Sequence, residues 1–176
     1  MRFYGAKELS RSFRTVRENT ITIAEEIPED QYDFQGAPDT RSVSQLLTHI
    51  ALAFHFQHQI HALEGLTTLE GFDFQAAMQP LRSQEQQTRS RDEIIELLRG
   101  NGQKWAEWLE GLSEEFLAER VGMPHGVTPA EKSRFEMILS VKEHEMHHRG
   151  QLMLIQRMLG LVPHLTRQMQ ARMAQK

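Results

Sequence analysis

The 176-residue sequence contains no cysteine. Disulfides, a cysteine-based zinc site and a cysteine nucleophile are therefore excluded together, and the composition is typical of a protein that works in a reducing cytosol. Any thiol chemistry would need a thiol supplied by a substrate or cosubstrate. Long apolar runs are also missing, and the N-terminus lacks the apolar core of a signal peptide. We therefore expect a cytoplasmic protein with no membrane partner.

The sequence also lacks a cluster of positively charged residues. The formal net charge is −4, and lysine and arginine are scattered along the chain. Nucleic-acid binding would need a clustered basic face, so we expect no nucleic-acid partner. No internal repeat or linker-like change of composition marks a second domain. The sequence predicts one domain over residues 1–176, with its core at about 5–160 and a C-terminal tail at 161–176.

Hydrophobic spacing predicts four long helices and no strands. Apolar residues recur near every 3.6 positions in each segment, which is the period of an amphipathic helix. The segments cover about residues 5–26, 42–64, 90–111 and 128–159. Polar connections at 65–89 and 113–127 complete the chain, and the first is long enough to run back along a helix. Four amphipathic helices of similar length predict an all-α fold, a four-helix bundle.

Local end signals support these helices. A capping box pairs a serine or threonine with an acid or amide three residues later, and the two side chains satisfy exposed N–H groups of the first turn. Three such pairs are present, at Ser42–Gln45, Ser90–Glu93 and Thr128–Glu131. Proline or glycine follows each helix, as expected where a helix ends, at Pro28, Gly65, Gly111 and Gly160.

Three of the nine histidines predict a metal site. His144 and His148 are four residues apart, so both project from one face of the last helix, in line with its apolar stripe. Buried imidazoles need partners, and one metal ion would satisfy both. His49 lies on the apolar stripe of the second helix and is the natural third ligand, because bundles build metal sites from facing helices.

The remaining histidines carry no such signal. His147 lies about 60° from His144 around the helix, where a supporting or surface role is expected. His55 and His58 point away from His49 and look exposed, and His61 lies at the edge of the apolar stripe. The other two are placed in a loop and beyond the last helix, His125 and His164.

The segment His144–His148 also matches the H-E-x-x-H pattern of zinc proteases. Such enzymes need a third protein ligand downstream, usually an acid or a histidine. No Asp or Glu follows Glu145, and His164 is the one histidine after His148. A di-iron site would need a second Glu-x-x-His on another helix, and none exists. Neither the zinc-protease nor the di-iron interpretation therefore has the full set of protein ligands that its metal site needs.

Three further residues have open roles. Glu145 could orient a ligand, accept a proton or form a salt bridge at the surface. Gln151 lies close to the direction of His144 and is a candidate hydrogen-bond donor beside the metal ligands. Arg149 points away from the three histidines, toward the surface or a neighbouring helix.

The assembled pieces resemble the DinB family, the DinB/YfiT-like helical bundles regarded as metal-dependent enzymes. The matching segments are Arg41–Ala51, Glu143–Gln151 and the lead-in Ile27–Phe34. The resemblance implies a four-helix bundle with up-down-down-up topology and a divalent metal, zinc or nickel, held by three histidines that map onto His49, His144 and His148. It also implies a homodimer.

Members of the family include S-transferases and isomerases that use a low-molecular-weight thiol, and proteins regarded as hydrolases. The resemblance therefore implies a metal-dependent transferase or hydrolase acting on a small-molecule substrate. The alternative is a non-catalytic, metal-binding dimeric bundle with a structural or ligand-binding role. Three imidazoles would leave a coordination position open for water or a thiol, and either could be activated there.

Overall fold

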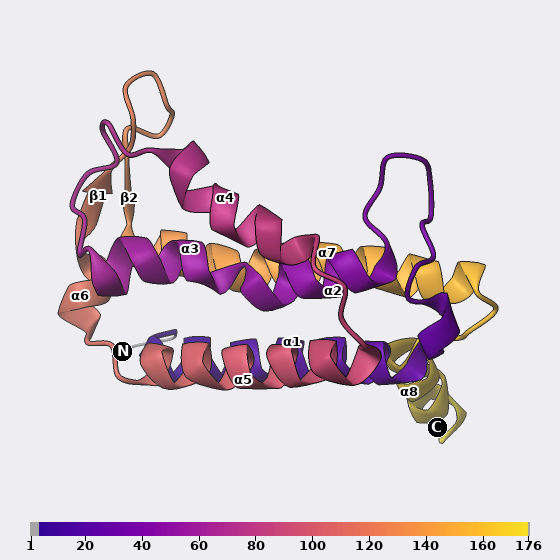
Figure 1. The fold of residues 1–176 in the computed structure, drawn as a ribbon. Helices are drawn as coiled ribbons and strands as arrows, with labels where there is room; N and C mark the ends of the chain where they lie inside the picture. The colour runs from indigo at the N-terminus through magenta and orange to yellow at the C-terminus, as the bar shows by residue number, and fades with distance from the viewer. Residues whose placement is uncertain (1–3, 176) are drawn as a thin grey trace.

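Helices make up most of the chain in the computed structural model, which describes residues 4–175 (Figure 1). The elements in chain order are α1 (Ala6–Glu26), the 3-10 turn η1 (Glu29–Gln31), α2 (Val43–Leu52), α3 (Phe54–His58), the π-helical turn η2 (Gln59–Leu63), α4 (Phe74–Glu85), α5 (Arg91–Glu110), α6 (Glu114–Ala118), β1 (Arg120–Gly122), β2 (Glu131–Ser133), α7 (Arg134–Met158) and α8 (His164–Ala174). Within residues 4–175, no helix combines the length and the apolar character needed to cross a membrane.

The first three predicted helices are confirmed, with their ends close to the expected positions. Ser42 and Ser90 cap α2 and α5, and each forms the expected reciprocal capping box. The second predicted helix is divided at Ala53 into α2 and α3 and finishes in the π-helical turn η2. Gly65 follows it with a positive φ of 59°, the left-handed conformation that favours glycine after a helix end.

The predicted start of the last helix was wrong, and so was the prediction of no strands. Residues 131–133 form β2, which pairs antiparallel with β1. The helix α7 begins at Arg134, where Ser133 and Glu136 form a capping box. Two capping patterns therefore follow one another in this segment. Pairing with β1 removes Glu131 from the first pattern, and the second sets the helix start.

The connection 65–89 was predicted as a polar loop, but it contains α4. Asp73 caps this helix, and its Oδ1 accepts a hydrogen bond of 2.9 Å from the backbone of Ala76. Pro80 lies inside the helix, and proline there usually indicates a break. In the structure, α4 packs on α2 (Figure 1). The C-terminal tail, for which no helix was predicted, contains α8.

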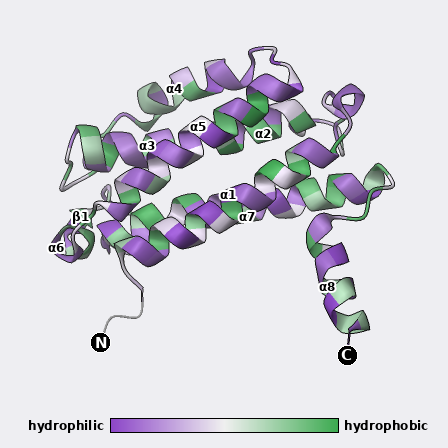
Figure 2. Ribbon diagram, turned by 90° about the horizontal axis from the view of Figure 1, so that it is seen from below, coloured by the Kyte–Doolittle hydropathy of each residue, from purple (hydrophilic) through white to green (hydrophobic). Residues whose placement is uncertain are grey.

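Three apolar clusters are present among the described residues. Two of them lie toward opposite ends of the long helices, along which hydrophobic positions recur (Figure 2). One cluster includes Ile23, Leu47, Leu98 and Leu152, and the other includes Phe13, Phe54, Trp105 and Val141. Trp105 is therefore a core residue, and Trp108 stacks on it. Buried polar residues on α1, α5 and α7 lie between the two clusters in sequence, at Arg17, Thr20, Asn101, Glu145 and His148.

Candidate metal centre

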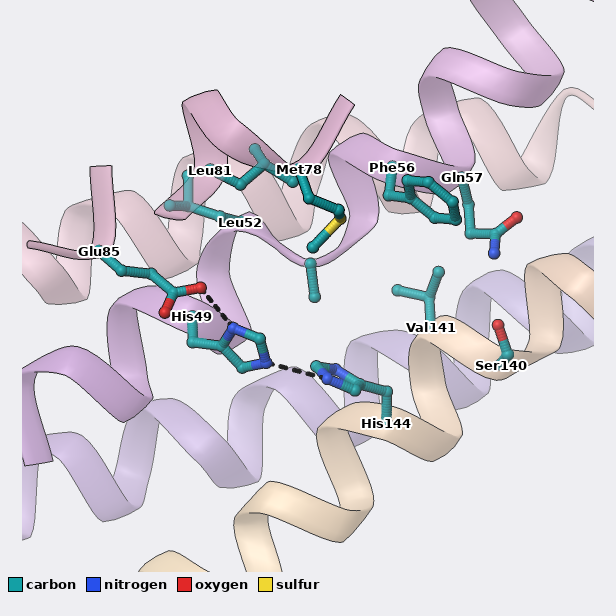
Figure 3. Close-up of a pocket in the computed structure, with 11 residues that line it drawn as sticks. His49, Leu52, Phe56, Gln57, Met78, Leu81, Glu85, Ser140, Val141 and His144 are labelled. Atoms are coloured by element: carbon teal, nitrogen blue, oxygen red, sulfur yellow. Dashed lines mark hydrogen bonds and ion pairs between the residues drawn. The ribbon is translucent and has the colours of Figure 1, made fainter. Parts of the chain in front are cut away.

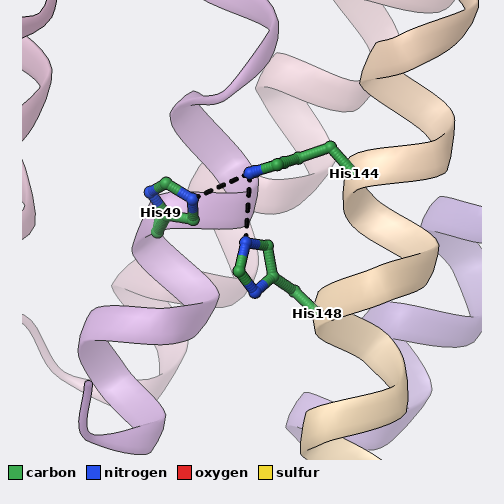
Figure 4. A group of neighbouring side chains, drawn as sticks. All are labelled: His49, His144 and His148. Atoms are coloured by element: carbon green, nitrogen blue, oxygen red, sulfur yellow. Dashed lines mark hydrogen bonds between the residues drawn. The ribbon is translucent and has the colours of Figure 1, made fainter. Parts of the chain in front are cut away.

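The structure brings together the three histidines that the sequence singled out (Figure 4). His49 comes from α2, and His144 and His148 come from successive turns of α7. The Nε2 atom of His144 lies 3.0 Å from Nε2 of His49 and 3.0 Å from Nε2 of His148. The candidate ligand atoms all lie within 4.8 Å of one another. Three nitrogen donors therefore converge on one point.

Hydrogen bonds at the outer side of two rings settle which nitrogen carries the proton. Nδ1 of His49 lies 2.5 Å from Oε1 of Glu85, and the other carboxylate oxygen, Oε2, accepts a hydrogen bond of 3.0 Å from Nε of Arg41. Nδ1 of His148 lies 2.8 Å from Oε1 of Gln151. A carboxylate and an amide oxygen can only accept, so we assign the proton to Nδ1 in both rings. In the neutral rings, both Nε2 atoms then present lone pairs to His144.

The charge state of Glu85 agrees with this assignment. Burial raises the pKa of Glu85, but hydrogen bonds from His49 and Arg41 outweigh burial and hold the pKa below its ordinary value. The side chain is therefore a carboxylate at neutral pH. Such a carboxylate fixes the ring orientation of a histidine and makes its other nitrogen a better metal ligand.

His144 completes the argument for a cation. Burial, followed by the neighbouring His148 and His49, lowers the pKa of His144 to about 4, so the ring is neutral at pH 7. Its Nδ1 is buried and has no hydrogen-bond partner. A single N–H on this ring can point at only one of the two nitrogens that lie 3.0 Å away. At least one close contact therefore joins two lone pairs, and a divalent cation at this point would convert both into ligands.

The role of Glu85 was missed by the sequence interpretation, because its segment was predicted to be a loop. A signal was present: Phe74, Met78, Leu81 and Glu85 are spaced by four, three and four residues, as on one face of a helix. Gln151 was expected to donate a hydrogen bond near His144, but its Oε1 accepts one from Nδ1 of the candidate ligand His148.

Glu145 does not face solvent, and it does not reach the three histidines. Its residue is 1% exposed, and both carboxylate oxygens accept hydrogen bonds from the guanidinium of Arg17, at 2.9 to 3.1 Å. Arg17 also donates to the carbonyl oxygens of Leu98 and Ile50. One arginine on α1 therefore binds α2, α5 and α7 at the level of the histidines. The predicted surface salt bridge is in fact a buried ion pair.

The other histidines are not among the converging rings. His147 is exposed and flanks the centre, with its ring centroid 5.0 Å from that of His148, and His125 is exposed in its predicted loop. His55 and His58 are half-buried against Phe54, which corrects the prediction that they are exposed.

His61 and His164 are both buried and hydrogen-bonded. His61 bonds to Arg134 at 2.9 Å and to Gln57 at 3.0 Å. His164 begins α8 and bonds to Asn19 at 2.9 Å. Both therefore serve the packing of the chain, away from the three converging rings.

Comparison with known proteins identifies the family. Residues 12–152 match the DinB superfamily. The Bacillus subtilis (strain 168) protein named "Uncharacterized protein YjoA" is 24% identical over 155 residues, which cover 88% of this chain and 91% of that protein.

Two crystal structures share the fold. The DinB-like YjoA of Bacillus subtilis superposes with a TM-score of 0.63 at 24% identity, over 87% of this chain and 92% of that chain. A DinB family protein of Exiguobacterium sibiricum 255-15 gives a TM-score of 0.61 at 19% identity, over 88% and 91%. With the family match covering most of the sequence, this chain belongs to the DinB superfamily.

Proposed function

We propose that the protein binds one divalent metal ion through Nε2 of His49, His144 and His148, and that it is a metal-dependent enzyme acting on a small molecule. The observation that carries the proposal is the convergence of three Nε2 atoms, two of them held as lone pairs by Glu85 and Gln151. Zinc and nickel both suit an all-imidazole site. The reaction is a thiol-dependent S-transfer or a hydrolysis.

When bound, the metal would act as a Lewis acid that activates water or holds a thiol in its thiolate form. The protein's own residues prepare the site for it. Glu85 and Gln151 hold the outer protons of two rings, and Arg41 holds Glu85 in turn. Because the chain has no cysteine, S-transfer would require an external low-molecular-weight thiol as cosubstrate.

The same proposal takes the long helices as one bundle with up-down-down-up order, in a homodimer. The extended connection that contains α4 supports this order, because it is long enough to return the chain along α2 before α5 begins. Light scattering on the purified protein measures the oligomeric state directly.

Elemental analysis of the purified protein tests the ligand set. We expect about one metal ion per chain in the wild type and almost none in His49→Ala or His148→Ala. His125→Ala is the control, because this exposed histidine lies in a loop apart from the three rings and should leave the metal content unchanged. Full metal content in either ligand variant would refute the proposed centre.

A second candidate is a structural, non-catalytic metal. It is favoured by the fact that the ligands come from two separate helices, α2 and α7, which a bound ion would cross-link. The two candidates separate when the cobalt-substituted protein is titrated with a low-molecular-weight thiol. A new sulfur-to-metal absorption band indicates an open coordination position. An unchanged spectrum, together with a melting temperature that falls when the metal is chelated, indicates a structural ion.

A further inference from the structure

Two cavities of different chemistry meet at the three histidines. One, of about 270 Å³, lies between α2, α3, α4 and α7 and is lined by His49 and His144. The other, of about 810 Å³, lies beside α4 and the second half of α7 and is lined by His148. Glu85 lines both, so the centre separates the two spaces. Each cavity therefore reaches the converging nitrogens from its own side.

The smaller cavity is apolar. Apolar side chains from four helices line it around the rings of His49 and His144 (Figure 3), namely those of Leu52, Phe56, Met78, Leu81 and Val141. Apart from the imidazoles, Glu85 is the ionisable residue in its lining. That carboxylate is already bound by His49 and Arg41, so it offers no free charge to a ligand.

The larger cavity carries charged side chains of both signs beside an apolar wall, and we call it the polar cavity. Arg41 and Arg82 line it with the carboxylates of Asp39 and Glu85, and three glutamines and several apolar residues complete the lining. Arg41 is engaged with Glu85, whereas Arg82 is exposed on the surface of α4. An anionic group on a ligand would stay in contact with water and with Arg82 in this cavity. In the apolar cavity the same group would lose both.

From this contrast we infer that the apolar cavity binds the reacting substrate by an uncharged, apolar group of about the size of a substituted benzene ring. A cavity of roughly 150 Å³ lined by aliphatic and aromatic side chains holds benzene. A volume of about 270 Å³ accommodates a ring with a short substituent. The inference rests on the proposed metal centre, since His49 and His144 form the floor of the cavity. It narrows the substrate class to neutral aromatic or branched aliphatic molecules.

Methionine methyl groups report on each cavity separately. Met78 lines the apolar cavity and Met158 lines the polar one. In ¹³C-methyl-methionine NMR of the zinc-loaded protein, titration with benzyl alcohol should shift the Met78 signal to saturation and leave Met158 unmoved. Benzoate, of the same ring size but charged, should leave Met78 unmoved. Equal shifts of Met78 by both compounds, or no shift by benzyl alcohol, would overturn the inference.

Two matched substitutions locate the binding. Ala53→Leu adds bulk to the apolar cavity and should weaken benzyl alcohol binding at least tenfold. Ala37→Leu adds the same bulk beside the polar cavity and should change the affinity by less than twofold. If Ala37→Leu weakens binding more than Ala53→Leu does, benzyl alcohol binds in the polar cavity and the inference is refuted.

The same titration keeps this inference distinct from the metal proposal. Full metal content without a Met78 shift overturns the cavity inference alone. A saturable Met78 shift in a protein that holds no metal leaves the apolar cavity supported as a ligand site and overturns the proposed metal centre.

Discussion

Replacing Arg17 by methionine should destabilise the fold severely. The side chain of Glu145 is almost completely buried, and both of its oxygens are bound by Arg17. Methionine keeps most of the volume of the arginine side chain, but the buried carboxylate of Glu145 loses its cationic partner. Breaking a buried pair in this way costs about 3–5 kcal/mol, because the remaining charge is desolvated and uncompensated. A domain of this kind has a total stability of roughly 5–15 kcal/mol, so the loss is a large fraction.

The double variant Arg17→Met/Glu145→Leu distinguishes an unpaired charge from lost packing. It removes both charged groups and replaces them with apolar side chains in a layer between two apolar clusters. The double variant should therefore be more stable than Arg17→Met alone, so the two substitutions should be strongly non-additive. Urea unfolding followed by tryptophan fluorescence gives the four free energies of the cycle.

A more exposed pair between α1 and α5 serves as the control. Arg14 of α1 lies 3.7 Å from Glu110 of α5, and their side chains are 34% and 56% exposed. Arg14→Met should cost less than about 1 kcal/mol, the usual contribution of an exposed pair. A loss below about 1 kcal/mol for Arg17→Met, or an additive cycle, would contradict the role assigned to the buried ion pair.

Further predictions concern two glycines and a buried histidine. Gly100→Ala should stabilise α5 by about 0.5–1 kcal/mol, because its new methyl group meets open space and alanine favours helix. Gly102→Ala should lower the melting temperature, because its Cβ would lie 2.9 Å from Cγ of Arg17. Burial, followed by the charge of Arg134, lowers the pKa of His61 to about 4, so the unfolded chain binds the extra proton between about pH 6.5 and 4. The unfolding free energy should therefore fall as the pH falls through this range, by roughly 3 kcal/mol for this group. His61→Gln should flatten the pH profile measured by urea unfolding, and an unchanged profile would contradict the assignment.

The features predicted from sequence are those with a local cause. The starts of α2 and α5 follow from serine capping boxes that span three residues, so neighbouring side chains decide them. The start of α7 was misplaced because two capping patterns compete locally, and the pairing of β1 with β2 selects the later one. Sequence patterns that involve only neighbouring residues cannot decide between the two capping boxes.

The same distinction applies to the candidate metal centre. His144 and His148 were found because helical spacing alone places them on one face, and His49 because it shares an apolar stripe. Glu85 and Arg17 act on residues 36 and 128 positions away, so only the packing of separate helices reveals their partners. The sequence therefore indicates which side chains converge, and the fold shows what holds them there.

The position of Glu145 explains why a protease-like pattern is misleading in this chain. In H-E-x-x-H zinc enzymes the glutamate serves as general base beside the metal. Here residue 145 lies about 100° around the helix from His144, and that direction faces α1 rather than α2. A proton taken up by Glu145 would weaken its buried bonds to Arg17, so this carboxylate is unsuited to proton transfer at the centre. The carboxylate that does contact one of the three histidines is Glu85, and it holds the outer proton of His49. Proton transfer at this centre would therefore fall to groups brought in with the substrate or the metal.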